Sequence, residues 1–220
     1  MDPVTPVSYG PGMRWSWILL LAVGCAGPKY AERDEYVPFE IGRSWVYSIQ
    51  EQGAEPFQLA TRVLGSDVRP LAGERRVEFM QAYGRISGMD QDVTKSIVAM
   101  ASDGPHEMVF NAWTWTIEHD PPIALLPATF QPGMTTEWKG VVTYRDERYE
   151  TTATISADGV QIVETPSGDL SCLLVRTVYD AGGLVVRRWF APGVGLVEIK
   201  VSGKAGGALA TLVSHAPPPR

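Results

Sequence analysis

Residues 170–190 read LSCLLVRTVYDAGGLVVRRWF, and this stretch decides the fold class. Two runs rich in branched and aromatic residues, Leu170–Tyr179 and Leu184–Phe190, flank the short segment Asp180–Gly183. Apolar runs of this length, interrupted by Gly and Asp, are typical of an antiparallel β-hairpin.

The same pattern recurs along most of the chain. Between the N-terminal region and the C-terminal prolines we expect these further strands: Arg43–Ile49, Phe57–Leu64, Arg75–Tyr83, Ser96–Ala101, Glu107–Trp115, Trp138–Tyr144, Glu147–Ser156, Val160–Glu164, Leu196–Ser202 and Leu209–His215. Asp90–Met100 is the best helical candidate, because sustained helical periodicity is otherwise missing after the N-terminal apolar run. The sequence therefore predicts an all-β protein, an antiparallel meander forming a barrel, a half-barrel or a sandwich.

The N-terminal region carries a targeting signal. Arg14 precedes an apolar run of about ten residues, which is too short to span a bilayer as a helix. The run ends at Gly24-Cys25, which resembles the lipobox of bacterial lipoproteins, although Ala22 stands where leucine is usual. We therefore expect lipidation at Cys25; the alternative is a buried apolar segment with a core cysteine.

These features divide the chain. We expect a signal peptide over residues 1–24, of which residues 1–12 are a candidate misannotated extension because Met13 can be the true start. A lipidated tether over residues 25–35, a single β domain over 36–215 and a disordered tail over 216–220 follow. The proline-rich break between Asp120 and Gly133 is a candidate seam between two lobes, but each half alone would be small for a stable core.

Charge and targeting suggest where the protein acts. The net charge of −6 argues against nucleic-acid partners, which favour basic surfaces. The expected partners are the membrane, through the N-terminal lipid anchor, and either a protein or an apolar ligand. Ala26 follows the lipidated cysteine in place of the aspartate associated with inner-membrane retention. In a Gram-negative bacterium this predicts the periplasmic face of the outer membrane.

Catalytic motifs are missing from the sequence. The three histidines have no zinc-site spacing, and the chain contains neither a nucleophile elbow nor a phosphate loop. Glu118-His119-Asp120 is the densest titratable cluster and reads as a polar loop; on a strand, His119 would face away from both acids. Asp90-Gln91-Asp92 reads as a solvated turn, and Cys172 as a small buried hydrophobe. We expect no enzymatic activity, catalytic residue, cofactor or metal.

Three segments resemble one group of proteins. Residues 36–47 read YVPFEIGRSWVY, residues 163–172 read VETPSGDLSC, and residues 189–197 read WFAPGVGLV. This chain resembles a broad group of uncharacterised bacterial β proteins that are secreted or lipid-anchored, in which Ser167 and Leu170 replace an alanine and a phenylalanine. The shared residues are turn formers and aromatics, so the resemblance implies a scaffold rather than an activity.

Two functions follow as expectations. The first is a lipid-anchored, non-enzymatic envelope domain for interaction or envelope maintenance. The alternative is a periplasmic carrier of a lipid or another apolar ligand, and a well-packed interior would favour the first, whereas an apolar cavity of several hundred cubic ångströms would favour the carrier. For the carrier, the candidate lining residues are Trp45, Tyr47, Trp113, Trp115, Trp138 and Trp189.

Overall fold

A computed structural model describes the backbone of residues 30–67, 76–86, 89–101, 103–112, 115–128, 130–131, 133–144, 146–204 and 206–219. Within these ranges, the side chains of 64–67, 76–86, 89–95, 111–112 and 115 are not described. The predicted signal peptide and Cys25 lie outside the described residues.

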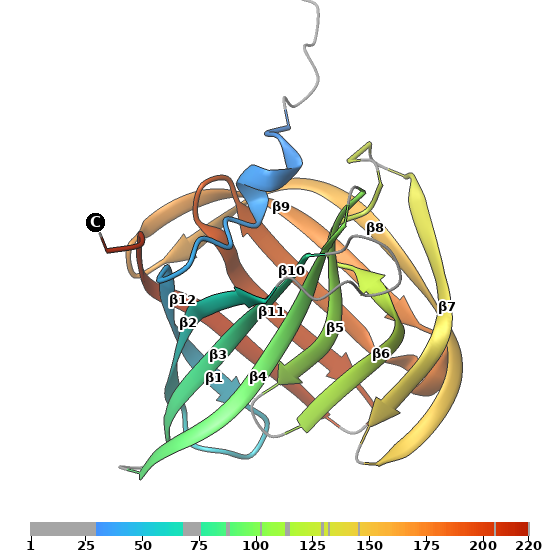
Figure 1. Cartoon of the computed structure of the whole chain (residues 1–220), viewed down its shortest axis with the longest axis horizontal. Coiled ribbons are helices and arrows are strands. Elements are labelled where there is room, and N and C mark those ends of the chain that lie inside the picture. Colours follow the sequence, from blue (N-terminus) through green and yellow to red (C-terminus); the bar gives the residue numbers. More distant parts are fainter. Residues whose placement is uncertain are drawn as a thin grey trace, which may run out of the picture.

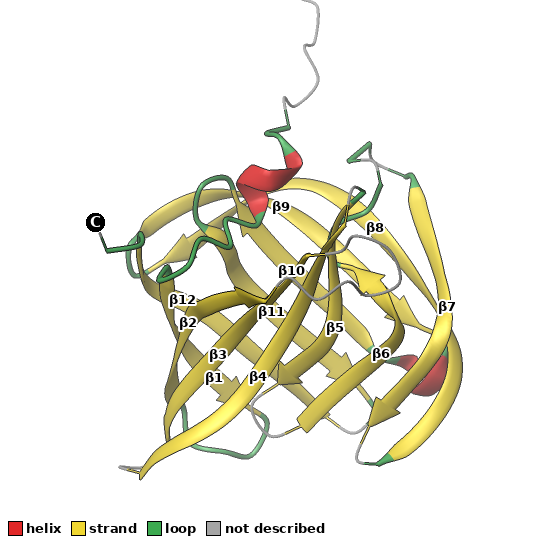
Figure 2. Ribbon diagram, in the orientation of Figure 1, coloured by secondary structure: helices red, strands yellow, loops and turns green. Residues whose placement is uncertain are grey.

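Twelve antiparallel strands form a closed barrel, in which each strand pairs with its neighbours in sequence and β1 pairs with β12 (Figures 1 and 2). The all-β meander predicted from the sequence is therefore confirmed, in its barrel form. The elements are η1 (Arg33–Tyr36), β1 (Ser44–Glu51), β2 (Phe57–Asp67), β3 (Arg76–Ile86), β4 (Met89–Ala101), β5 (Gly104–Ala112), β6 (Trp115–Ala124), β7 (Thr135–Tyr144), β8 (Glu147–Thr165), β9 (Gly168–Tyr179), η2 (Ala181–Gly183), β10 (Val185–Ala191), β11 (Gly195–Gly203) and β12 (Gly206–Ala216).

Alternation along the strands gives the barrel its interior. In β1, Trp45, Tyr47 and Ile49 are buried, and the residues between them are more exposed. The same alternation buries Val197, Ile199 and Val201 in β11. Since successive side chains point to opposite faces of a strand, one set fills the barrel and the other faces outward.

Three sequence predictions differ from the structure. The helical candidate Asp90–Met100 was wrong, because these residues belong to β4. Glu147–Ser156 and Val160–Glu164 are parts of one strand, β8, and the expected turn at Asp158-Gly159 is a register shift within it. Both cases have one cause: the barrel supplies a hydrogen-bonding partner along the whole segment, which local sequence does not reveal.

The third difference concerns β6, which was expected to be a polar loop running into a proline-rich break. Glu118 and Asp120 are exposed, whereas His119 lies between them with 5% exposure. This is the arrangement expected for these residues on a strand. Prolines 121 and 122 end the β6–β7 pairing, which stops at Asp120 and Val141, because proline cannot donate to the ladder.

One end of the barrel is capped by the chain that precedes β1. Tyr36 and Val37 are buried there, and the Tyr36 ring meets the Phe130 ring edge to face, with centroids 5.4 Å apart. The Arg33 guanidinium donates to the backbone carbonyls of Asp103, Pro127 and Ala128. The segment over residues 30–40 is therefore built into what we call the cap, even though residues 30–35 were expected to form part of a free tether.

Two of the segments that carry the resemblance, residues 36–47 and 189–197, meet beside this cap. Trp45 Nε1 donates to the Val194 carbonyl at 2.7 Å, and Tyr47 Oη donates to the Leu196 carbonyl at 2.9 Å. Gly195, at φ +95°, leaves room for the Trp45 ring and Pro38, as expected for a glycine needed for close approach. Residues about 150 positions apart thus form one scaffold contact.

The C-terminal prolines lie at the same end as the cap. β12 ends at Ala216, and the Pro219 ring approaches Gly42, at which an added Cβ would lie 2.8 Å from Pro219 Cδ. As to membrane spans, no helix in the described part of the chain is long and apolar enough to cross a bilayer.

Candidate functional site

The end of the barrel opposite the cap opens into a cavity of about 1120 Å³, here called the mouth cavity. Its wall comes from both ends of the chain and from the middle: β1, β6–β9, β11, β12 and the η2 turn. The described lining residues are Glu51, Gln52, Ile117, Val142, Tyr144, Tyr149, Thr151, Tyr179, Ala181, Gly182, Leu184, Val201, Ser202, Gly203, Lys204, Gly206, Gly207 and Ala208.

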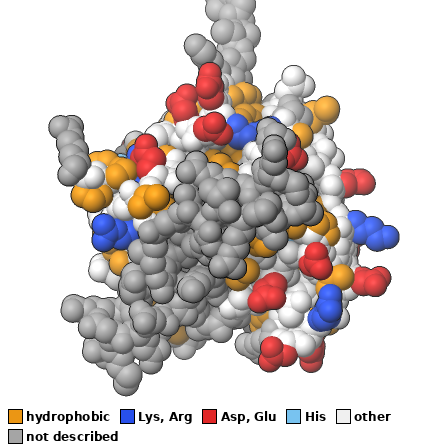
Figure 3. Space-filling view, in the orientation of Figure 1, with side chains coloured by type: hydrophobic (Ala, Val, Ile, Leu, Met, Phe, Trp, Pro, Cys, Tyr) orange, Lys and Arg blue, Asp and Glu red, His pale blue; other side chains and the backbone are white. Residues whose placement is uncertain are grey.

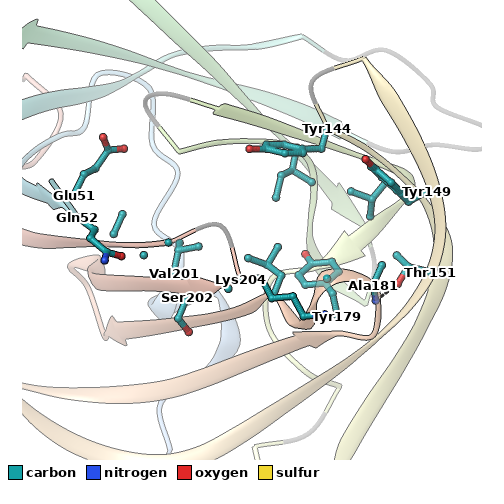
Figure 4. A pocket seen from close by; sticks show the side chains of 18 residues that line it. Glu51, Gln52, Tyr144, Tyr149, Thr151, Tyr179, Ala181, Val201, Ser202 and Lys204 are labelled. Carbon is teal, nitrogen blue, oxygen red and sulfur yellow. Dashed lines mark hydrogen bonds between the residues drawn. The ribbon is translucent and has the colours of Figure 1, made fainter. Parts of the chain in front are cut away.

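Tyrosines form one side of this cavity. Tyr144, Tyr149 and Tyr179 come from three consecutive strands, β7, β8 and β9, and their rings lie around the same space (Figure 4). The aliphatic side chains of Ile117 and Val142 lie on the same side. A tyrosine offers an apolar face and one hydroxyl, so this wall suits a molecule that is mostly apolar with few polar groups.

The opposite side of the mouth is more polar. Glu51 and Gln52 lie across the cavity from Tyr149, and the β11–β12 turn adds Lys204, which lies beside Tyr179 (Figure 4). Gly203, Gly206 and Gly207 also line this side and have no side chains to fill the opening. The cavity therefore combines an apolar wall with a polar rim at its open end, as ligand sites commonly do.

Tyr179, which lines the cavity, contacts a buried histidine, His119. His119 Nε2 and Tyr179 Oη are 2.9 Å apart, and the two rings are stacked. The His119 ring also meets the Trp138 ring edge to face, with centroids 5.8 Å apart. These aromatic contacts fix His119 in the barrel interior.

An ion pair lies further inside the barrel. Arg188 Nη2 donates to Glu107 Oε2 at 2.7 Å, and both side chains are about 95% buried. The guanidinium also lies over the Phe110 ring, 4.9 Å from its centroid, which adds a cation–π contact. Burial raises the pKa of Glu107, and the Arg188 charge opposes that rise.

Burial keeps His119 neutral. Loss of solvent and, to a smaller extent, the positive charge of Arg188 lower its pKa from 6.5 to about 3. The backbone of Met108 acts in the opposite direction but does not complete a hydrogen bond to Nδ1. His119 is thus a neutral hydrogen-bonding partner of Tyr179 at physiological pH.

This pKa predicts acid sensitivity. Below pH 6.5, His119 binds a proton in the unfolded chain but stays neutral in the folded chain. The free energy of unfolding therefore falls as the pH drops towards 3. Linkage gives a loss of about 2 kcal/mol between pH 7 and pH 5 from this residue. In urea unfolding at both pH values, the loss should be about 2 kcal/mol larger in wild type than in His119→Gln.

His215 provides the matched control, because it is exposed near the end of β12. His215→Gln should retain the wild-type difference between pH 7 and pH 5. Equal pH dependence in wild type and His119→Gln would contradict a neutral buried His119.

The predicted aromatic lining residues do not share one site. Trp45 and Tyr47 are buried at the capped end and line a second, smaller cavity of about 110 Å³ that also includes Glu107 and Arg188. Burial raises the pKa of Tyr47 well above its ordinary value. Neither side chain lines the mouth cavity, and both pack at the capped end.

Of the other four candidate tryptophans, the structure describes the side chains of two, Trp138 and Trp189. Trp138 is 8% exposed and donates from Nε1 to the Pro121 carbonyl at 3.0 Å, while Trp189 is half-buried and donates to Gln161 Oε1. Neither lines a cavity described above. Trp113 lies outside the described residues, and the side chain of Trp115 is not described.

The Trp138 ring explains an unusual glycine. A Cβ at Gly140 would lie 2.5 Å from Trp138 Cζ2 and 2.5 Å from the Asp120 carbonyl oxygen. Such contacts require movement of backbone, so Gly140 lets the ring lie flat against β7. Trp138 therefore acts in packing.

The three tyrosines of the mouth cavity are not among the lining residues expected from the sequence, most of which are tryptophans. Tyr144 ends the expected strand Trp138–Tyr144, and Tyr149 lies near the start of the next, Glu147–Ser156, so both are close to the same hairpin end. Tyr179 ends a strand in the same way. Three tyrosines at strand ends that meet at one rim are a recognisable signal only when the strand directions are known.

Cys172 is a free thiol with 0% exposure, and burial raises its pKa to about 12. It fills space on β9, as the sequence suggests. Within the described ranges no three or more His, Cys, Asp or Glu side chains gather as metal ligands would.

Comparisons with known proteins place the fold. Neither a family model nor a curated protein sequence matches the chain. A presumed exported protein with a YmcC-like fold from Bacteroides fragilis has a similar structure, with 12% identity and a TM-score of 0.52 over 81% of this chain and 97% of that one. A presumed lipoprotein from Parabacteroides distasonis has 13% identity and a TM-score of 0.45 over 82% of this chain and 98% of that one.

The first neighbour and the strand order define the class: this chain is an all-β protein similar in fold to the YmcC-like protein of Bacteroides fragilis. Within that class, its barrel has one capped end and one open end.

Proposed function

We propose that this protein is a lipid-anchored protein of the bacterial cell envelope that binds an apolar molecule with a polar end, such as a lipid, in the mouth cavity. The observation that carries the proposal is the cavity itself, about 1120 Å³ in volume, with an apolar and tyrosine-rich wall. Ligand pockets are commonly about 300–1000 Å³, so the space accommodates a molecule of lipid size. Of the two functions expected from the sequence, this supports the carrier over an interaction module with a packed interior.

The arrangement of polar groups supports the orientation of the ligand. The apolar part would lie against Tyr144, Tyr179 and Val142, away from water, and the polar end would remain near the rim. Burial of apolar chain contributes about 0.8 kcal/mol per methylene, whereas a buried charge would need a partner. The polar residues Gln52 and Lys204 at the rim are placed to meet the polar end.

Anchoring and localisation belong to the same proposal. Lipidation at Cys25 would hold the barrel at the periplasmic face of the outer membrane, where apolar molecules must cross an aqueous space. The role needs no enzyme activity, because binding and release are sufficient.

The test uses the mature domain with Cys25→Ser, expressed in the periplasm and purified without detergent. Native mass spectrometry and organic extraction should reveal one bound apolar molecule per protein. Ala208→Trp places a large ring in the mouth cavity, because Ala208 lines it and is 8% exposed. This variant should lose most of the bound molecule.

Ser214→Trp is the matched control, since Ser214 lies on the same strand but is exposed outside the cavity. It should keep wild-type occupancy. An empty wild-type protein, or equal occupancy in both tryptophan variants, would overturn ligand binding in the mouth cavity and favour the interaction module.

A further inference from the structure

The first described residue lies at the capped end of the barrel. Tyr30 packs near Phe130, with ring centroids 5.9 Å apart, and the Ala31 amide donates to Tyr36 Oη. Figure 2 shows η1 at this end of the barrel and the short η2 turn at the opposite end, by the mouth. The chain between an anchor and the barrel therefore reaches the cap, not the rim.

The distance from cap to mouth follows from β12. This strand runs from Gly206 at the rim to Ala216 at the capped end, where Ala216 pairs with Ser44. Ten steps of about 3.3 Å, tilted by about 40° to the barrel axis, give an axial distance of about 25 Å.

The reach of the anchor is shorter. Cys25 and Tyr30 are five residues apart, and a fully extended chain covers at most about 3.6 Å per residue, or about 18 Å. A lipid at Cys25 therefore cannot reach a membrane that the mouth faces directly while Tyr30 stays packed in the cap.

Exposed apolar side chains are also found towards the capped end. Ile41 is 56% exposed before β1, and Met134 is 50% exposed before β7. Acidic side chains gather around η1 at this end (Figure 3). They oppose binding to anionic headgroups, so the anchor rather than surface charge would hold the cap near the bilayer.

We propose that the protein is oriented with its cap towards the membrane. The mouth then opens into the aqueous compartment, away from the leaflet that holds the anchor. The inference rests on the proposed lipidation and binding function. It adds that the bound molecule enters and leaves from the aqueous side rather than directly from the anchoring leaflet.

The experiment measures the distance of each end from the bilayer. The full lipidated protein is labelled with a donor dye at Ile41→Cys, next to the cap, or at Lys204→Cys at the rim, since Cys172 is fully buried. Each form is placed in phosphatidylcholine vesicles that carry an acceptor dye on the lipid headgroup. Energy transfer should be several-fold greater from position 41 than from position 204.

Equal transfer from both positions would indicate a barrel lying on its side, and greater transfer from position 204 would indicate an inverted barrel. Either result, or no transfer from either position in protein whose mass shows the lipid, overturns the proposed orientation. The same mass measurement separates this outcome from a failure of lipidation. Ligand occupancy of the soluble domain is measured independently.

A longer tether tests the cause of the orientation. Twenty Gly and Ser residues inserted after Ala26 would extend the average reach by about 25 Å. The difference between the two labelled positions should then shrink. An unchanged difference would show that the short tether does not set the orientation. Labelled Cys25→Ser protein added to the same vesicles controls for transfer without an anchor and should show none.

Discussion

Arg188→Ala should destabilise the protein by about 3–5 kcal/mol, because it leaves the Glu107 carboxylate buried and without its charged partner. The two side chains are only 4% and 6% exposed, and the pair is joined by a 2.7 Å hydrogen bond. The substitution also removes the guanidinium from the Phe110 ring. Urea unfolding at pH 7 gives the free energy of unfolding.

The neighbouring arginine supplies the control. Arg187 alternates with Arg188 on β10 and lies on the other face of the strand, so Arg187→Ala should change stability by about 0.5 kcal/mol or less. Replacing both partners, with Glu107→Leu and Arg188→Met, should restore most of the loss because neither charge remains buried. Equal losses for the two single arginine variants would show that the buried pair has no special role.

Trp45→Ala should cost a similar 3–5 kcal/mol, since a fully buried tryptophan is truncated to a small side chain. Trp45 is 2% exposed, and its Nε1 donates to the Val194 carbonyl at 2.7 Å. The loss should also loosen the cap, where the ring packs beside Gly195. Thermal unfolding measures the first effect, and amide hydrogen exchange over residues 35–47 measures the second.

Trp189→Ala is the comparison for this prediction. Trp189 is half-buried and bonds to a side chain, Gln161, rather than to backbone in the cap. Its truncation should cost less than half as much and leave exchange over residues 35–47 unchanged. Increased exchange there in Trp189→Ala as well would contradict a specific role for Trp45 in the cap.

Local sequence was sufficient for most of the strands. β9 and β10 carry the residue types and the Asp180–Gly183 turn of a hairpin, and both strands form close to the predicted bounds. The predictions failed where the segment has little local preference. Asp90–Met100 contains polar and helix-tolerant residues, and its pairing with β3 and β5 makes it a strand.

The candidate site was much less predictable. Trp45 and Tyr47 were expected beside a ligand, but their partners in the cap, Val194 and Leu196, are about 150 residues away. His119 was expected in a polar loop because Glu118 and Asp120 flank it, but it is buried in the barrel. Burial depends on which strands lie opposite, and neighbouring residues do not report it.

The sequence by itself determined the all-β class, because the period of apolar residues and the turn chemistry are local properties. The glycines at positions 193 and 195, among the turn formers of the segment over residues 189–197, have φ angles of +72° and +95°. Closure of the barrel was decided only in three dimensions, by the pairing of β1 with β12. The cap, the buried Glu107–Arg188 pair and the tyrosine-lined mouth all depend on that closure, because each joins side chains that only the closed sheet brings together.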